Sequence, residues 1–118
     1  MRKDVNIGGT MVTLEANAAT PWRFKNVFHE DLLRLLNQTV DDEMLAVDTI
    51  SRLAYVMMMQ AEGDTKNATE DKFIAWLEGF EPETFMDTDT LFGILGVYNS
   101  QAIKSVEAKK KPRKSPVK

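Results

Sequence analysis

The sequence has no cysteine and only one histidine among its 118 residues. The lack of cysteine excludes a disulfide scaffold, a thiolate nucleophile and a cysteine-based zinc site, and it suits a reducing cytosol. No apolar run approaches the roughly 20 residues that a membrane-spanning helix needs. The N-terminal stretch MRKDVNIGG also lacks the apolar core of a signal peptide. We therefore expect a soluble cytoplasmic protein that does not contact a membrane.

Recognisable catalytic and metal-binding patterns are also missing. His29 has no serine or cysteine companion at a diagnostic spacing, and partly exposed helix surface is the simpler interpretation. The pair Gly8-Gly9 belongs to neither of the common glycine-rich phosphate-binding motifs. The acidic run at 41–43 lacks the alternating oxygen ligands and central glycine of a calcium loop, so helix capping explains it better. We predict a protein that is not an enzyme and binds no cofactor or metal.

The charges are unevenly distributed along the chain, whose net charge is −3. Residues 108–118 carry six basic side chains and no acidic one, which leaves nine basic against 18 acidic side chains in residues 1–107. Because 43% of the residues are apolar, residues 1–107 can form one domain with a single core. The charged, proline-containing tail at 108–118 should be disordered.

Residues 3–16 have the pattern of a β-hairpin. Gly8-Gly9 lies between β-branched residues, and type I′ and II′ turns need residues that accept a positive φ. If this pair forms a two-residue loop, Val5 lies opposite Val12 and Ile7 opposite Thr10. One face then gathers mostly apolar side chains: Val5, Ile7, Thr10, Val12 and Leu14. Since an isolated hairpin is marginally stable in water, we expect it to dock on the first helix.

Residues 20–36 predict that first helix, which we expect to organise the core. Thr20 can cap its start, and Pro21 suits its first turn. An apolar stripe follows at spacings of three and four, widened by three further side chains: Phe24, Phe28, Leu32 and Leu35, with Val27, Leu33 and Leu36. So many apolar side chains on one helix require cover from other parts of the chain.

Three further helices are predicted. The second begins near residues 39–41 and ends at Glu62, with Gly63 as its left-handed cap. The third follows Thr69 as N-cap and directs inward three apolar side chains: Phe73, Ile74 and Leu77. The fourth spans about 88–106, and its two glycines suggest close packing. The predicted fold class is mainly α: an N-terminal β-hairpin packed on a bundle of about four helices.

Not all apolar side chains of the later helices can fit in such a small core. Three successive methionines, Met57 to Met59, cannot all face inward, because neighbours on a helix lie about 100° apart. One interpretation is core packing with a tolerant boundary, and the other is an adaptable surface for a partner. Trp76 raises the same alternatives. On the second interpretation, the candidate partner-binding residues are Met57, Met58, Met59, Trp76, Phe80, Phe85 and Met86.

The order of these features resembles a known family. The resemblance is carried by VNIGGTMVTLEANAATPWRFKNVFHEDLLRLL at 5–36, by KFIAWLEGF at 72–80 and by a closing helix before a lysine-rich end. Together these segments are similar to the tail assembly chaperones of long-tailed bacteriophages and prophages, of the type found in Gram-positive hosts. The resemblance covers most of the chain.

This resemblance implies a specific role. The protein would act in the host cytoplasm, bind the helical tape measure protein, recruit major tail tube subunits, and be absent from the mature virion. A longer form made by ribosomal frameshifting is a further expectation, since the lysines at 109–111 are compatible with an adenine-rich slippery sequence. Self-association is expected as well, because many copies are needed to coat a long client.

The basic tail leaves three interpretations open. It can be a solvated terminus, a nucleic-acid-binding segment, or a linker or arm that meets an acidic patch on a neighbour. The acidic body and the lack of aromatic residues among the lysines disfavour nucleic acid. The alternative function is therefore a small phage-encoded regulatory or adaptor protein that uses this tail to contact nucleic acid.

Overall fold

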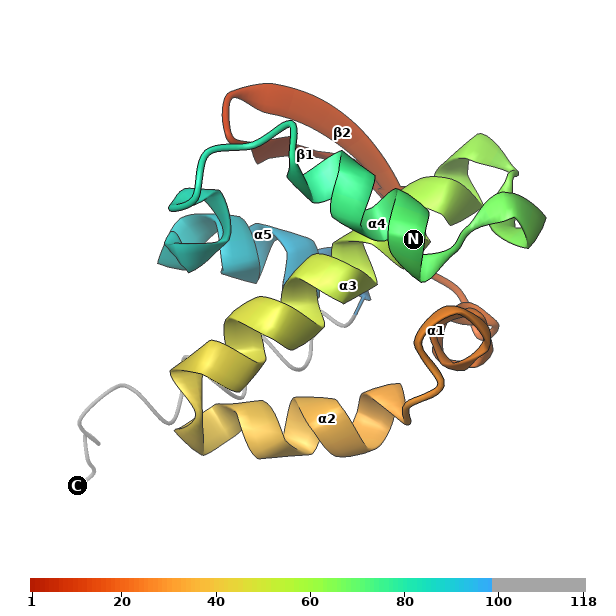
Figure 1. Ribbon diagram of the computed structural model, residues 1–118, viewed down its shortest axis with the longest axis horizontal. Coiled ribbons are helices and arrows are strands. Elements are labelled where there is room, and N and C mark those ends of the chain that lie inside the picture. Colours follow the sequence, from red (N-terminus) through yellow and green to blue (C-terminus); the bar gives the residue numbers. More distant parts are fainter. Residues whose placement is uncertain (99–118) are drawn as a thin grey trace, which may run out of the picture.

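The computed structural model describes residues 1–98 as an antiparallel hairpin packed on five α-helices (Figure 1). The elements, in chain order, are β1 (Arg2–Ile7), β2 (Thr10–Glu15), α1 (Thr20–Phe28), α2 (Leu32–Gln38), η1 (Thr39–Asp41), α3 (Glu43–Glu62), η2 (Thr65–Asn67), α4 (Glu70–Leu77), η3 (Thr84–Met86) and α5 (Thr88–Tyr98). The predicted fold class is confirmed. The end of the fourth predicted helix and the tail at 108–118 lie outside the described residues.

The hairpin has the predicted register. Val5 pairs with Val12 and Ile7 with Thr10, and Gly8 and Gly9 both adopt positive φ in the turn. Val5, Ile7, Val12 and Leu14 are buried, whereas Thr10 on the same face is exposed. The alternation of apolar and polar residues therefore fixes which face of the ribbon enters the core.

The predicted docking of the hairpin on the first helix is wrong. β2 packs mainly on α3, and β1 packs mainly on α5. The apolar face of α1 is used elsewhere, since the ring of Phe28 lies edge-on against Phe73 of α4, with 5.1 Å between ring centroids. Helix α3 contacts β2, α1, α2, α4 and α5, and Figure 1 shows it running through the middle of the molecule. The core is therefore organised around α3, not around residues 20–36.

The single helix predicted over residues 20–36 is two helices. α1 ends at His29, which is exposed and left-handed (φ 60°) and donates its backbone N–H to the carbonyl of Lys25. Asp31 then starts α2 by accepting the backbone N–H groups of Leu33 and Arg34. The break turns α2 towards α3, and it leaves Leu33 57% exposed.

The prediction that Thr20 is the N-cap of α1 is also wrong, because the N-cap is Ala19. Thr20 is fully buried, where its hydroxyl accepts the N–H of Asn17 (3.0 Å) and donates to Oε1 of Gln60 (2.7 Å). The residue therefore links the start of α1 to the end of α3. A buried hydroxyl is tolerated only when it is hydrogen-bonded, and here both of its roles are filled.

Arg52 of α3 contacts residues at the junction between α1 and α2. Its guanidinium pairs with Asp48 and with Glu30 (2.6 Å) and lies over the ring of Phe28, 5.3 Å from the centroid. The hydrogen bonds that Arg52 donates to Asp48 raise the pKa of Arg52, partial burial opposes this, and Glu30 raises it further. Because the Arg52 side chain is only 15% exposed, these contacts hold a charged group against the aromatic core.

The remaining helix ends follow the predicted capping, with one shift. Gly63 closes α3 in the left-handed conformation, and Thr69 caps α4 by accepting the N–H of Lys72 (3.1 Å). α3 begins at Glu43, later than predicted, because Asp42 is extended and accepts the N–H of Leu45 (3.0 Å). Residues 39–41 form a separate short 3-10 turn.

Candidate functional site

The seven predicted partner-binding residues occupy different depths in the structure. Met57, Met59 and Phe85 are buried in the core, with exposed fractions of 0%, 6% and 6%. Met58, Trp76 and Phe80 are half-buried, and Met86 is 61% exposed. The methionine run therefore follows the interpretation of core packing with a boundary position, since Met57 and Met59 are buried and Met58 is half-buried, and partner binding by these residues stays a prediction.

Three of these residues form one aromatic cluster, and a fourth is adjacent to it in sequence. The rings of Trp76 and Phe80 meet edge-on at 5.1 Å between centroids, and both contact Phe85, at 5.8 and 5.7 Å. Such pairs contribute roughly 0.5–1.5 kcal/mol each beyond their buried area. Met86 directly follows Phe85 in η3. We call Trp76, Phe80 and Met86, with Phe85 behind them, the α4–η3 edge.

The α4–η3 edge is connected to the centre of the molecule by further rings. Trp76 contacts Tyr55 of α3, Tyr55 contacts Phe73, and Phe73 contacts Phe28 of α1. Helix α4 is thus attached to the body largely through aromatic side chains. Ile74, which was predicted to face inward, is 51% exposed because Phe73 and Trp76 occupy the inner side of this short helix.

Other exposed apolar side chains lie away from this edge. Sequence reasoning did not single out Trp22, Val40 and Met44, whose exposed fractions are 70%, 58% and 69%. Trp22 lies two positions before Phe24, which places it on the opposite side of α1 from the buried stripe. This spacing was the signal that could have identified it as exposed.

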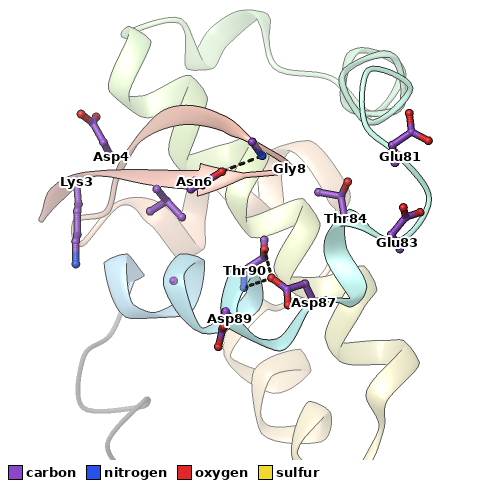
Figure 2. Close-up of a pocket in the computed structure, with 13 residues that line it drawn as sticks. Lys3, Asp4, Asn6, Gly8, Glu81, Glu83, Thr84, Asp87, Asp89 and Thr90 are labelled. Carbon is purple, nitrogen blue, oxygen red and sulfur yellow. Dashed lines mark hydrogen bonds between the residues drawn. The ribbon is translucent and has the colours of Figure 1, made fainter.

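A second surface feature lies on the other side of residues 81–87. A depression of about 660 Å³ is bounded by the hairpin, η3 and the start of α5. Figure 2 shows Glu81, Glu83 and Thr84 on one side of it, with the hairpin opposite and Asp87 and Asp89 below. Its charged lining residues are five carboxylates and one amine: Asp4, Glu81, Glu83, Asp87, Asp89 and Lys3. We call this depression the acidic groove.

Two glycines allow the walls of the acidic groove to approach each other. A β-carbon on Gly8 would lie 3.1 Å from Cδ1 of Phe80 and 3.2 Å from Cγ2 of Thr84. A β-carbon on Gly93 of α5 would lie 3.2 Å from Cγ1 of Val5. The close packing suggested by the glycines of the last helix is therefore present at Gly93, where α5 meets β1.

Hydrogen bonds fix the base of the acidic groove. Asp87 accepts both the backbone N–H (3.2 Å) and the hydroxyl (2.8 Å) of Thr90, which starts α5. In the hairpin, Asn6 accepts the N–H of Gly9 (2.9 Å), and Asp4 accepts the hydroxyl of Thr13. These carboxylates are held in place by neutral donors.

Within residues 1–98, no group of three or more histidine, aspartate or glutamate side chains is arranged to hold a metal ion. In the same range, no helix is long and apolar enough to cross a membrane. The part of the chain that the structure describes thus has two surface features of distinct chemistry, the α4–η3 edge, which is apolar, and the acidic groove.

Comparisons of the chain with family models, with curated proteins and with solved structures find no match.

Proposed function

We propose that this chain is a non-enzymatic tail assembly chaperone of a long-tailed phage, which binds the tape measure protein and helps to recruit tail tube subunits. The observation that carries this proposal is the α4–η3 edge, where the rings of the half-buried Trp76 and Phe80 contact Phe85 and the exposed Met86 follows Phe85 in η3. The resemblance of residues 5–36 and 72–80 to such chaperones supports the same role.

The chemistry of the edge suits an amphipathic helix as client. Helices that bind in grooves insert apolar side chains at spacings of three and four, and they need aromatic and flexible side chains to receive them. Trp76 and Phe80 supply rigid rings, and Met86 supplies an adaptable thioether. A tape measure protein is a long helical molecule, so it offers many such segments.

The burial of the seven candidate residues indicates which of them can contact a client directly. Met58, Trp76, Phe80 and Met86 can reach a client from the surface, whereas Met57, Met59 and Phe85 would support them from within. On this proposal the protein works in the host cytoplasm, several copies coat one client, and none remains in the mature virion. The frameshifted longer form is tested by reading the gene near codons 109–111 for a slippery sequence.

The binding proposal is tested with Met86→Asp. Burial of a methionine side chain contributes about 1.5–3 kcal/mol, so placing a carboxylate there should weaken binding of a tape measure fragment about tenfold or more. The fragment is titrated calorimetrically into the full chain. Met44→Asp is the matched control, because Met44 is similarly exposed (69% against 61%) but lies at the start of α3.

The expected result is weaker binding for Met86→Asp and unchanged binding for Met44→Asp. Equal affinities for both variants and the unaltered chain would remove the α4–η3 edge from consideration. Failure of the unaltered chain to bind any segment of the tape measure protein would contradict the chaperone role itself.

The second candidate function is an adaptor that contacts nucleic acid through residues 108–118. The six basic side chains favour it, since each can neutralise a phosphate and release a counterion. Substitution of those six residues by glutamine should then abolish a salt-sensitive gel shift. The chaperone proposal expects no such shift with the unaltered chain at physiological salt.

A further inference from the structure

We propose that the outer face of α2 and η1 is an interface between two copies of this chain, which pair with these helical segments antiparallel. We call this surface the α2–η1 face, and its residues are Leu33, Arg34, Asn37, Val40 and Asp41. The proposal does not rest on tape measure binding. Figure 1 shows α2 along the lower side of the molecule and α4 along the upper side, so the α2–η1 face and the α4–η3 edge can be occupied together.

The helices α2 and η1 form one continuous helical segment. Thr39, at their junction, donates its backbone N–H to the carbonyls of Leu35 and Leu36, so the chain keeps winding from α2 into η1. Leu33 and Val40 are seven residues apart, which is about two turns of a helix. They therefore lie on the same side of the segment, where they are 57% and 58% exposed, whereas Leu35 on the other side is buried.

The exposed side of this segment has the pattern of a seam between paired helices. Asn37 is exposed and lies between the two apolar residues, four positions after Leu33 and three before Val40. Spacings of four and three are those of the contact positions in a two-helix pair. A single asparagine at such a position fixes the register of the paired helices, because its amide is best satisfied by the same amide of the partner.

The charges beside this seam match an antiparallel second copy. Arg34 and Asp41 are both exposed and are also seven residues apart, so they lie on the same flank of the seam. When two copies pair antiparallel about a two-fold axis, this flank meets itself in reverse, and Arg34 of each copy lies near Asp41 of the other. A parallel pair would place like charges together. Neither side chain belongs to an ion pair found within residues 1–98, so both can pair with another molecule.

The symmetry of this contact limits the size of the assembly. An interface that uses the same surface of both copies closes on itself, so it gives a dimer and not a filament. Each copy contributes two strongly exposed apolar side chains, Leu33 and Val40. Such a contact is small beside the roughly 800 Å² per partner of a standard interface. We therefore expect weak association, with a dissociation constant between about 10 μM and 1 mM.

An exchange of charges tests the antiparallel arrangement. Two Arg34→Asp chains would bring carboxylates together on this flank, and two Asp41→Arg chains would bring guanidinium groups together. Each variant alone should dimerise about tenfold more weakly than the unaltered chain in sedimentation equilibrium at low salt, because attraction is replaced by repulsion. An equal mixture of the two should dimerise about as tightly as the unaltered chain, because each carboxylate again meets a guanidinium.

An apolar variant and matched controls isolate the role of the seam. Leu33→Gln with Val40→Gln removes its exposed apolar side chains and should leave the chain monomeric up to about 1 mM. Arg23→Asp on α1 and Glu78→Arg at the end of α4 reverse exposed charges elsewhere and should leave the association unchanged. Since all of these positions are exposed, the circular dichroism spectrum of each variant should match that of the unaltered chain.

Three outcomes would overturn the proposal. One is an unaltered chain that stays monomeric up to about 1 mM. Another is unchanged association of Leu33→Gln with Val40→Gln, which would assign the contact to a different surface. The third is a mixture of Arg34→Asp and Asp41→Arg that stays monomeric where the unaltered chain dimerises. None of these measurements contains a tape measure fragment, so failure of this interface and failure of the proposed function are separate results.

Discussion

The α4–η3 edge and the acidic groove both include residues of one short segment, 79–87. Phe80, Phe85 and Met86 are the apolar side chains of this segment, while Glu81, Glu83 and Asp87 line the groove. The only helical element in this segment is η3, which is three residues long. The difference teaches that a polypeptide turn anchored by buried rings can present an apolar surface and a charged surface at once.

The anchor shared by both surfaces is Phe85, and its removal should have the largest effect. Phe85→Ala deletes a ring that is 6% exposed and contacts both Trp76 and Phe80. We expect a loss of about 3 kcal/mol in the free energy of unfolding, since buried Phe→Ala changes cost about 3–5 kcal/mol. Chemical denaturation measures it. A loss below about 1 kcal/mol would show that the segment is not anchored by this ring.

The contact between this segment and the hairpin turn is tested by Gly8→Ala. Gly8 has a φ of 61°, and an added β-carbon would press on Phe80 and Thr84. We expect a destabilisation of about 1–2 kcal/mol from the left-handed backbone, increased by this contact. Gly9→Ala is the control, because Gly9 also has a positive φ but its β-carbon would meet nothing within 4 Å. Equal losses would mean that the turn and the segment are not in contact.

The contribution of the buried Tyr55 to stability can be tested by its dependence on pH. Burial raises the pKa of Tyr55, whose hydroxyl has no hydrogen-bond partner within residues 1–98. The Thr69 backbone lowers that pKa without reaching hydrogen-bond geometry. Because the folded chain keeps the phenol proton more firmly than the unfolded chain, the stabilisation is complete below about pH 10 and is lost as pH rises through the folded pKa.

Tyr55→Phe should therefore reduce the loss of stability above about pH 10, while leaving stability at neutral pH unchanged or slightly higher because an unpaired buried hydroxyl is removed. Thermal unfolding at a series of pH values measures both effects. Burial also raises the pKa of Tyr98, so Tyr98→Phe gives the comparison at the end of α5. An unaltered alkaline profile in Tyr55→Phe would contradict the account.

The sequence predicted the hairpin well because its information is local. Gly8-Gly9 requires positive φ, and strict alternation then sets the register and the buried face. The caps at Thr69 and Gly63 were predictable for the same reason. Each depends on residues within one turn of the chain.

The division between α1 and α2 could not be seen in the same way. The apolar stripe continues through His29 at helical spacing, so periodicity alone indicates one helix. The break depends on a left-handed histidine followed by an aspartate cap, and tertiary contacts such as Arg52 with Glu30 stabilise it. Periodicity likewise could not decide that Ile74 is exposed, because α4 is covered on one side only.

The two surfaces also differ in how far the sequence could identify them. Trp76, Phe80 and Met86 were candidates by composition, but their depths depend on the packing of η3. The acidic groove joins Asp4 to Glu81 and Asp89, which are far apart in the chain, so only the fold brings them together.

The two tryptophans allow the most direct test of the central claim, that the α4–η3 edge receives a tape measure helix. Trp76 lies in the edge, and Trp22 is 70% exposed on α1. In a titration of the ¹⁵N-labelled chain with a tape measure fragment, the indole N–H signal of Trp76 should shift with saturation, while that of Trp22 stays unchanged. A shift of Trp22 without a shift of Trp76 would contradict the claim.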